Sequence, residues 1–243
     1  TCSGSGGDTT RSVTVTMAAG GTGVSGAVDS SLVNRHQESA NLVYVFAGNT
    51  TSGTPVATVP VTQDAGACTF RYGVAGLADG SYTVALTSDG GATFKRSVSV
   101  PVAGAVAVRD FAPTRVVRVG PGRPIAHPNQ VTGLQSGDVV EIDAGVYTGA
   151  EKIWPTSNLT LRGVGGRAHL VAPAPPAEVS NGKAIWVTQG ANMMVENIEF
   201  SGAAVDSAKN GAGIRAEGRD LAICGSYFHD NENGILGGSG KGR

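Results

Sequence analysis

The densest group of chemically active side chains lies near the end of the sequence, at His229, Asp230 and Glu232. These residues follow Phe228 directly and precede an apolar pair that begins at Ile235, so a turn or groove edge is expected here. An imidazole beside carboxylates offers a general base and oxygen ligands. The alternative is structural, because Asp and Asn side chains also hold turns through hydrogen bonds to the backbone. We take His229 as a candidate catalytic residue, with Asp230 and Glu232 as candidate binding residues.

A second group of candidate residues lies between residues 206 and 219, upstream of His229. Lys209 is a candidate catalytic base with Asp206 as its acidic binding partner, or both belong to a solvated loop. Arg215 and Arg219 flank a short expected strand, and a guanidinium pairs well with substrate carboxylates. Arg215 is therefore a candidate catalytic residue and Arg219 a candidate binding residue. The alternative partners of the two arginines are carboxylates on adjacent coils: Glu196, Glu199 and Glu217.

Other titratable residues give weaker signals. Glu141 and Asp143 alternate on the outward face of an expected strand, where they share a cation or simply keep the face hydrated. His127 and His169 have no partner at a motif spacing. No Ser-His-Asp arrangement, P-loop or dinucleotide fingerprint is present, since the glycines at 163–166 form a turn that does not open a helix.

The elements that must position these residues come from a repeat. Two stretches match at a shift of 28, and a third copy starts at Ile235. The aligned pairs are Asn192 with Asp220, Met193 with Leu221, Val195 with Ile223, and Phe200 with Phe228, while Ile185 and Ile214 lead the two copies. Such repeats predict stacked units that contact only their neighbours. Inward side chains should fill a core in which Phe200 and Phe228 stack.

Composition narrows the class of protein. The net charge is −1, charged residues make up 15% of the chain, and Lys and Arg are scattered, so a nucleic-acid partner is not expected. No apolar run approaches the ~20 residues of a membrane-spanning helix. Abundant Val, Thr and Ser with 37 glycines favour short strands joined by tight turns. The predicted class is an all-β protein of secreted type.

The composition shifts near residues 111–113, which predicts a domain boundary. Upstream, alternating apolar runs separated by Gly, Asp and Asn predict an antiparallel β-sandwich over 11–112, after a flexible tether at 1–10. The segments Gly23–Val28 and Gly76–Val84 are similar to transthyretin-like or carboxypeptidase-regulatory-like modules of secreted bacterial proteins. That resemblance implies a spacer or stalk without chemistry of its own.

Downstream, the segments 137–149, 158–163 and 192–200 resemble the first coils of right-handed parallel β-helix proteins of the pectate-lyase-like superfamily. The resemblance covers residues 116–236 and is nearest to alginate- and chondroitin-lyase-like members and to bacterial β-helix proteins of unassigned activity. It implies that 113–243 is an incomplete β-helix of about four coils, C-terminally truncated and inactive on its own.

The family resemblance also implies chemistry. Lyases of this architecture neutralise a uronate carboxylate, often with calcium held by acidic side chains, and a Lys or Arg removes the adjacent proton. Hydrolases on the same scaffold use paired carboxylates. We expect an exported protein that binds an acidic polysaccharide and that, if it is an enzyme, cleaves uronic-acid glycans by β-elimination. The alternative is a non-catalytic surface scaffold or adhesin.

The three cysteines bear on location. Residues 1–8 resemble the start of a mature bacterial lipoprotein, in which Cys2 is lipidated before a Gly/Ser tether; the alternative is a trimmed linker. The expected location is therefore extracellular or in the cell envelope, with membrane contact only through that lipid. Cys68 and Cys224 fall in different expected domains, so we do not expect them to pair, and Cys224 is interpreted as a small buried apolar residue.

Overall fold

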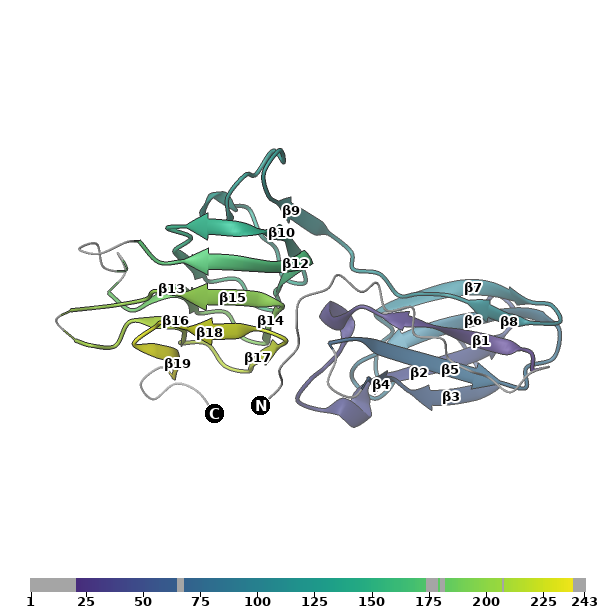
Figure 1. Ribbon diagram of the computed structural model, residues 1–243. Coiled ribbons are helices and arrows are strands. Elements are labelled where there is room, and N and C mark those ends of the chain that lie inside the picture. The colour runs from purple at the N-terminus through teal and green to yellow at the C-terminus, as the bar shows by residue number, and fades with distance from the viewer. Residues whose placement is uncertain (1–20, 65–67, 174–178, 180–181, 207, 238–243) are drawn as a thin grey trace. The chain divides into compact units, whose positions relative to one another are not determined.

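The computed structural model describes residues 21–64, 68–173, 179, 182–206 and 208–237 of the chain. These residues are almost entirely strands and loops, with three short 3-10 turns, η1 (Ser30–Leu32), η2 (Glu38–Ala40) and η3 (Pro128–Gln130). The predicted all-β class is confirmed (Figure 1). The chain divides into two compact units between Pro113 and Thr114, and each unit has its own hydrophobic core. Cys2 and the residues after Gly237 lie outside the described part.

The N-terminal unit contains two four-stranded sheets, in the orders β4-β5-β1-β8 and β3-β2-β6-β7. The strands are β1 (Gly23–Val28), β2 (Leu42–Ala47), β3 (Ala57–Pro60), β4 (Thr62–Gln63), β5 (Phe70–Ala75), β6 (Gly80–Thr87), β7 (Arg96–Val102) and β8 (Val106–Val108). Neighbouring strands are antiparallel except β1 and β8, which are parallel. Side chains from both sheets, such as Val43 and Tyr72, share one buried cluster. The antiparallel strands expected from the alternating runs are present.

The C-terminal unit is built from parallel strand pairs throughout its described residues. Its strands are β9 (Val116–Val119), β10 (Val139–Thr148), β11 (Lys152–Trp154), β12 (Thr160–Val171), β13 (Ala184–Thr188), β14 (Met193–Glu196), β15 (Ile198–Ser201), β16 (Ala212–Ala216), β17 (Leu221–Cys224), β18 (Tyr227–His229) and β19 (Asn233–Gly237). The larger sheet has the order β17-β14-β12-β10-β9, and β15 pairs with both β12 and β18. The smaller sheet has the order β11-β13-β16-β19.

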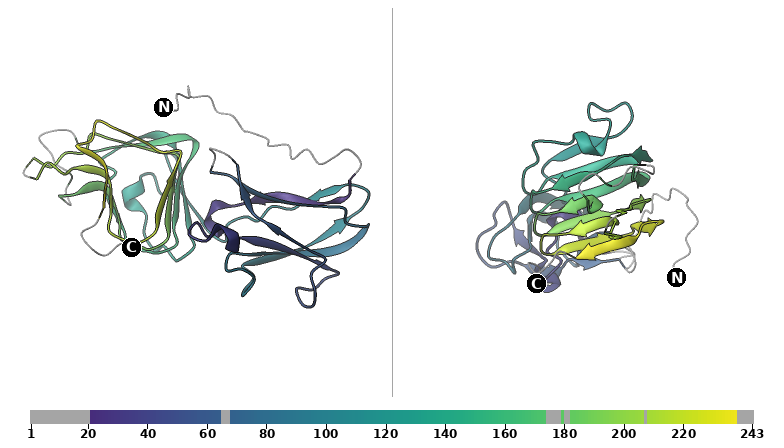
Figure 2. Two further views of the ribbon diagram at one scale, coloured as in Figure 1. Left: turned by 90° about the horizontal axis from the view of Figure 1, so that it is seen from below. Right: turned by 90° about the vertical axis from the view of Figure 1, so that its left-hand side faces the viewer.

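The chain alternates between these two parallel sheets. From β10 onward it leaves the larger sheet for one strand of the smaller sheet and then returns beside the strand it left. Figure 2 shows the resulting stack of strands in this unit. Parallel neighbours lie ~4.8 Å apart, so equivalent side chains of successive passes stand directly beside each other.

Most of the repeat alignment is confirmed as strand register. Met193 pairs with Leu221, Val195 with Ile223 and Phe200 with Phe228. The alignment of Ile185 with Ile214 is wrong, because Ile214 pairs with Trp186. Every residue of β13 is buried, so alternation of apolar and polar residues cannot fix its register.

The turns that begin successive passes carry Asn or Asp in the left-handed backbone region. Asn158, Asn192 and Asp220 have φ of 59°, 53° and 64°. Asn192 Nδ2 donates to Asn158 Oδ1 at 2.8 Å, and Asn158 Nδ2 donates to Ser136 Oγ at 2.7 Å. Asn and Asp tolerate this conformation because their short polar side chains bond locally. The turns therefore stack as a hydrogen-bonded ladder.

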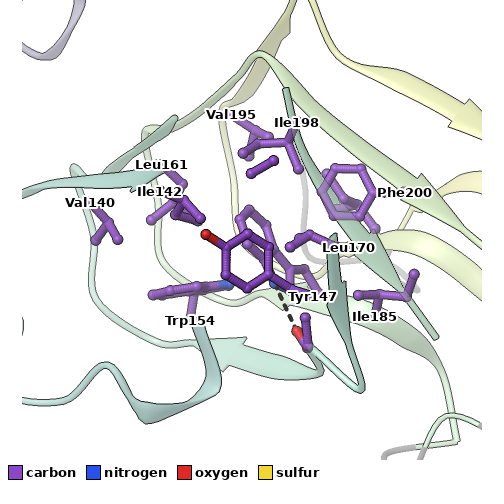
Figure 3. Packing of buried hydrophobic residues seen from close by; sticks show 14 of the residues in the cluster. Val140, Ile142, Tyr147, Trp154, Leu161, Leu170, Ile185, Val195, Ile198 and Phe200 are labelled. Carbon is purple, nitrogen blue, oxygen red and sulfur yellow. Dashed lines mark hydrogen bonds between the residues drawn. The ribbon is translucent and has the colours of Figure 1, made fainter. Parts of the chain in front are cut away.

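Aromatic side chains connect the passes inside the core. The rings of Trp154 and Trp186 lie 5.2 Å apart edge to face, and Trp186 and Phe200 have the same separation. Phe200 and Phe228 stack at 5.0 Å with an interplanar angle of 7°, as the repeat predicts. Trp186 Nε1 donates to the carbonyl of Ala150 at 3.1 Å, which satisfies its buried polar atom. Figure 3 shows this packing around Trp154, Tyr147 and Phe200.

Truncation of Phe200 tests the core. Phe200→Ala should lower the free energy of unfolding of this unit by about 3–5 kcal/mol, because it removes a fully buried ring and leaves a cavity. Both tryptophans of the chain lie in this unit, so tryptophan fluorescence during urea unfolding reports on it selectively. The control is Val146→Ala on β10, where the side chain is 68% exposed and the change should stay within about 0.5 kcal/mol. Equal effects of the two substitutions would contradict the assignment of Phe200 to the core.

The Asn ladder gives a second prediction. Asn192→Ala should destabilise the same unit by about 1–2 kcal/mol, because alanine is strained at φ 53°. Asn192→Gly removes the same side-chain hydrogen bond but permits this backbone conformation. The glycine variant should therefore unfold at a higher urea concentration than the alanine variant, and the reverse order would show that backbone strain is not the cause.

Candidate functional site

His229 lies at the end of β18 with both ring nitrogens engaged. Its Nδ1 is 2.8 Å from Asp230 Oδ2, and its Nε2 is 3.1 Å from Glu199 Oε1. The pKa of His229 is raised, mainly by the hydrogen bond with Asp230 and further by Glu199, although partial desolvation opposes the shift. Two of the predicted site residues, His229 and Asp230, thus form one hydrogen-bonded pair.

A second histidine joins this pair from another strand. His169 on β12 has Nδ1 3.5 Å from Glu199 Oε1 and Nε2 2.7 Å from Ser201 Oγ. The rings of His169 and His229 lie 5.5 Å apart. Glu199 therefore sits between two imidazoles. No motif spacing in the sequence predicts a partner for His169, and the partners predicted for Glu199 are arginines.

Strand register explains why these side chains meet. His169 pairs with Glu199, which pairs with Tyr227, and two residues further along Ser201 pairs with His229. Residues two apart on a strand share a face, so all five point outward from the same patch of the larger sheet. The intervening residues Leu170, Phe200 and Phe228 point into the core. The site is thus the outward counterpart of the phenylalanine stack.

Because of an irregularity in β12, the sequence repeat does not predict the position of His169. Thr160 pairs with Met194, a shift of 34, whereas Ala168 pairs with Ile198, a shift of 30. Thus β12 contains four more residues than the matching stretch of β14 and β15. Within that extra length Gly165 and Gly166 have φ of 72° and 137°, which glycine adopts without strain. A search that allowed four inserted residues would have aligned His169 with Glu199.

An aromatic and a cationic side chain border the cluster. The ring of Tyr227 is stacked 4.9 Å from that of His229, and the tyrosine is 50% exposed. The guanidinium carbon of Arg167 lies 5.7 Å from the centre of the Tyr227 ring, and its Nε donates to the carbonyl of Gly225 at 3.2 Å. This edge of the site offers a flat ring and positive charge to solvent.

The cluster can transfer protons and hold a cation. Among the described residues, ligand atoms of His169, Glu199 and His229 all lie within 4.8 Å of one another. Imidazole and carboxylate serve as general acids and bases and as metal ligands. The family resemblance implies calcium, but calcium prefers six to eight oxygen ligands, and this group offers two nitrogens.

Glu232 has a structural contact that occupies its carboxylate. One oxygen accepts hydrogen bonds from the backbone N–H groups of Val205 at 2.9 Å and Gly211 at 2.7 Å. These bonds lower the pKa of Glu232. Asn231 acts similarly, accepting from the N–H of Ala203 and donating to the carbonyl of Phe200. Both side chains hold the loop between β15 and β16 through these hydrogen bonds. Their contacts therefore match the structural alternative, in which side chains of this group stabilise a turn.

The other predicted site residues lie elsewhere. Lys209 and Asp206 form an exposed pair at 3.0 Å on the loop after β15. Arg215 is on β16 in the smaller sheet, so the structure places it on a different sheet from His229. Arg219 is exposed in the turn before β17, and its carbonyl accepts from the N–H of Asn192.

Carboxylates considered in the sequence analysis have partners of their own. Glu217 accepts from Lys183 and from Gln189 at 3.1 Å, and the Lys183 contact is the main cause of its lowered pKa. Glu141 pairs with Arg162 at 2.8 Å and Arg118 at 3.3 Å across three strands of the larger sheet.

Asp143, two residues along β10 from Glu141, forms a bidentate pair with Arg123 at 2.7 and 2.9 Å. That hydrogen bonding lowers the pKa of Asp143. The outward acidic residues of β10 therefore take part in ion pairs of the fold.

The remaining features offer less chemistry. A shallow open pocket of about 400 Å³ in the N-terminal unit is lined mainly by hydroxyl side chains such as Thr83, Ser97 and Ser99, with no titratable group. Cys68 and Cys224 are both disulfide-bonded, so neither is a free thiol, and the interpretation of Cys224 as a simple apolar residue is wrong. None of the described helices is long and apolar enough to cross a membrane.

Comparison with protein-family models, with curated proteins and with solved structures finds no match for this chain.

Glu232 gives a prediction with a defined pH dependence. The pKa of Glu232 is lowered in the folded protein from its ordinary value of 4.5. Its contribution to the stability of the folded loop is therefore present above pH 4.5 and is lost as the pH falls through the lowered pKa. Glu232→Gln should therefore speed hydrogen exchange at the amides of Val205 and Gly211 at pH 7. Acidification of the wild type should lower the protection factors of the same two amides, which are corrected for the slower intrinsic exchange at low pH.

Glu217→Gln is the matched control for this substitution, because it removes another carboxylate with a lowered pKa from a different contact. It should leave exchange at Val205 and Gly211 unchanged. If neither Glu232→Gln nor low pH changes the protection of these two amides, Glu232 does not hold the loop.

Proposed function

We propose that the described residues between Thr114 and Gly237 form a right-handed parallel β-helix and that the preceding unit is an antiparallel β-sandwich. The support for the helix is the repeated return of the chain to two parallel sheets, with a continuous aromatic core between them. Crossovers between parallel strands are right-handed in about 98% of cases, which favours that hand. The sandwich is supported by one core shared between two four-stranded sheets.

We infer that the outward face of β12, β15 and β18 binds an acidic polysaccharide. The observation that carries this proposal is the half-exposed Tyr227 ring with Arg167 and His229 beside it. An aromatic ring presents apolar surface to a sugar, and its hydroxyl can form a hydrogen bond. A guanidinium matches the geometry of a carboxylate.

Cleavage of the glycan by β-elimination is a second candidate function. It is favoured by the imidazoles of His169 and His229, which both lie beside the carboxylate oxygen Oε1 of Glu199. Elimination requires a base that removes the proton next to the uronate carboxylate and an acid that protonates the leaving oxygen. His169 and His229 are the candidate groups for these two transfers, since both side chains lie on the outward face of the sheet and are only partly buried.

We also propose that the protein functions outside the cytoplasm, either secreted or in the cell envelope. The disulfide-bonded state of Cys68 and Cys224 supports this location, because disulfides persist in oxidising compartments. An extracellular location agrees with a polymeric glycan as ligand.

The test is binding of residues 1–243 to alginate, pectate and hyaluronan by affinity electrophoresis. Arg167→Ala and Tyr227→Ala should each weaken binding about tenfold, which corresponds to the loss of ~1.4 kcal/mol. The matched control is Arg35→Ala, whose guanidinium lies over Phe70 in the N-terminal unit. Absence of binding to all three polymers would refute the proposal and favour a scaffold or adhesin.

The same incubations detect cleavage through the ultraviolet absorbance of unsaturated uronate products. Binding without any rise in absorbance would exclude elimination on these polymers and leave the binding function in place. A rise in absorbance that His169→Gln abolishes, while binding persists, would support elimination at this site.

A further inference from the structure

The geometry around Glu199 matches the spacing of ligands around a metal ion. Its Oε1 lies 3.1 Å from His229 Nε2 and 3.5 Å from His169 Nδ1. Ligands at ~2.0–2.1 Å from a tetrahedral zinc ion are ~3.3–3.4 Å from one another. The two measured separations bracket that value. The third separation, between the two imidazole nitrogens, is within 4.8 Å, so the two rings must move closer to each other for the three donor atoms to converge on one ion.

The outer ring nitrogens have the partners that metal-bound histidines need. His229 Nδ1 is 2.8 Å from the carboxylate of Asp230, and His169 Nε2 is 2.7 Å from Ser201 Oγ. A histidine that binds a metal through one nitrogen usually donates the other N–H to a carboxylate, carbonyl or water, which fixes its tautomer and orientation. Asp230 and Ser201 thus hold the two rings with the remaining nitrogens facing Glu199.

The backbone under these side chains belongs to paired strands of the larger sheet. His169, Glu199 and His229 lie on three paired strands, and the residues beside them in β12, β15 and β18 point into the aromatic core. Sites carried by strands hold their geometry more precisely than sites on loops. The donor set is accordingly preformed.

The donor types select the class of ion. Two imidazole nitrogens with one carboxylate suit zinc and neighbouring transition metals, whereas calcium and magnesium prefer oxygen ligands alone. Three protein ligands leave at least one coordination position open. All three side chains are only partly buried, with exposed fractions of 23–27%, so that position faces solvent.

We propose that His169, Glu199 and His229 bind one divalent ion of the zinc class, with Asp230 and Ser201 as positioning residues. The open position is available to water or to a carboxylate, either of which the ion polarises. The proposal goes beyond glycan binding and does not depend on it, because metal binding is measured without any glycan.

The test uses residues 1–243 without a histidine tag, stripped with a chelator and titrated with Zn²⁺ against a chromophoric competitor. One ion per chain should bind. Co²⁺ should give visible absorption bands that Zn²⁺ abolishes. His169→Gln and Glu199→Gln should each weaken Zn²⁺ binding at least tenfold, and Asp230→Asn should weaken it about 10–100-fold through loss of orientation.

The matched control is His36→Gln, which removes an exposed histidine of the N-terminal unit and should leave Zn²⁺ affinity unchanged. Urea unfolding of each variant in chelator establishes that the apo fold is intact. The proposal is overturned if the wild type binds no Zn²⁺. It is also overturned if folded His169→Gln and Glu199→Gln proteins bind as tightly as the wild type. Zn²⁺ binding without glycan binding would refute only the proposed glycan function.

Discussion

The parallel register of β12, β15 and β18 is the constraint on which both the core and the candidate site depend. Because side chains alternate between the two faces of a strand, one register sets both faces at once. It places Phe200 on Phe228 inside the unit and brings Ser201 beside His229 outside it. A slip of one residue would expose the phenylalanines and bury the imidazoles. The hydrophobic core therefore enforces the geometry of the polar cluster.

The turns reinforce this register at one end of each pass. Asn158 and Asn192 occupy left-handed backbone conformations and hydrogen-bond to each other across neighbouring passes. At the other end, Asn231 and Glu232 bind backbone groups of the preceding loop. Polar residues that look like one catalytic group in the sequence thus have different roles, depending on whether they lie within the strand or after it. His229, within β18, faces the cluster, while Glu232, beyond it, holds the chain.

Sequence reasoning succeeded where the repeat is regular. The constant shift of 28 aligned Phe200 with Phe228 correctly, because the spacing from Met193 to Phe200 equals that from Leu221 to Phe228. It failed at Ile185, where burial on both sides of β13 removes the alternation that reports register. It also missed the link between His169 and Glu199, because four extra residues in β12 break the shift. The chemistry of His229 was visible locally, but its partners are set by pairing between strands.

Two groups of outward side chains on the larger sheet, one around Glu141 and one around Glu199, differ in the chemistry that they can support. Arg118, Glu141 and Arg162 alternate in sign across neighbouring strands, so Glu141 has a positive partner on each side. Ion pairs near the surface contribute little free energy. Around Glu199 the partners are two imidazoles, a type of side chain that serves both in acid–base chemistry and as a metal ligand. The same parallel stacking yields a row of ion pairs in one place and a cluster of metal-ligating and acid–base side chains in another, because imidazole replaces guanidinium beside the carboxylate.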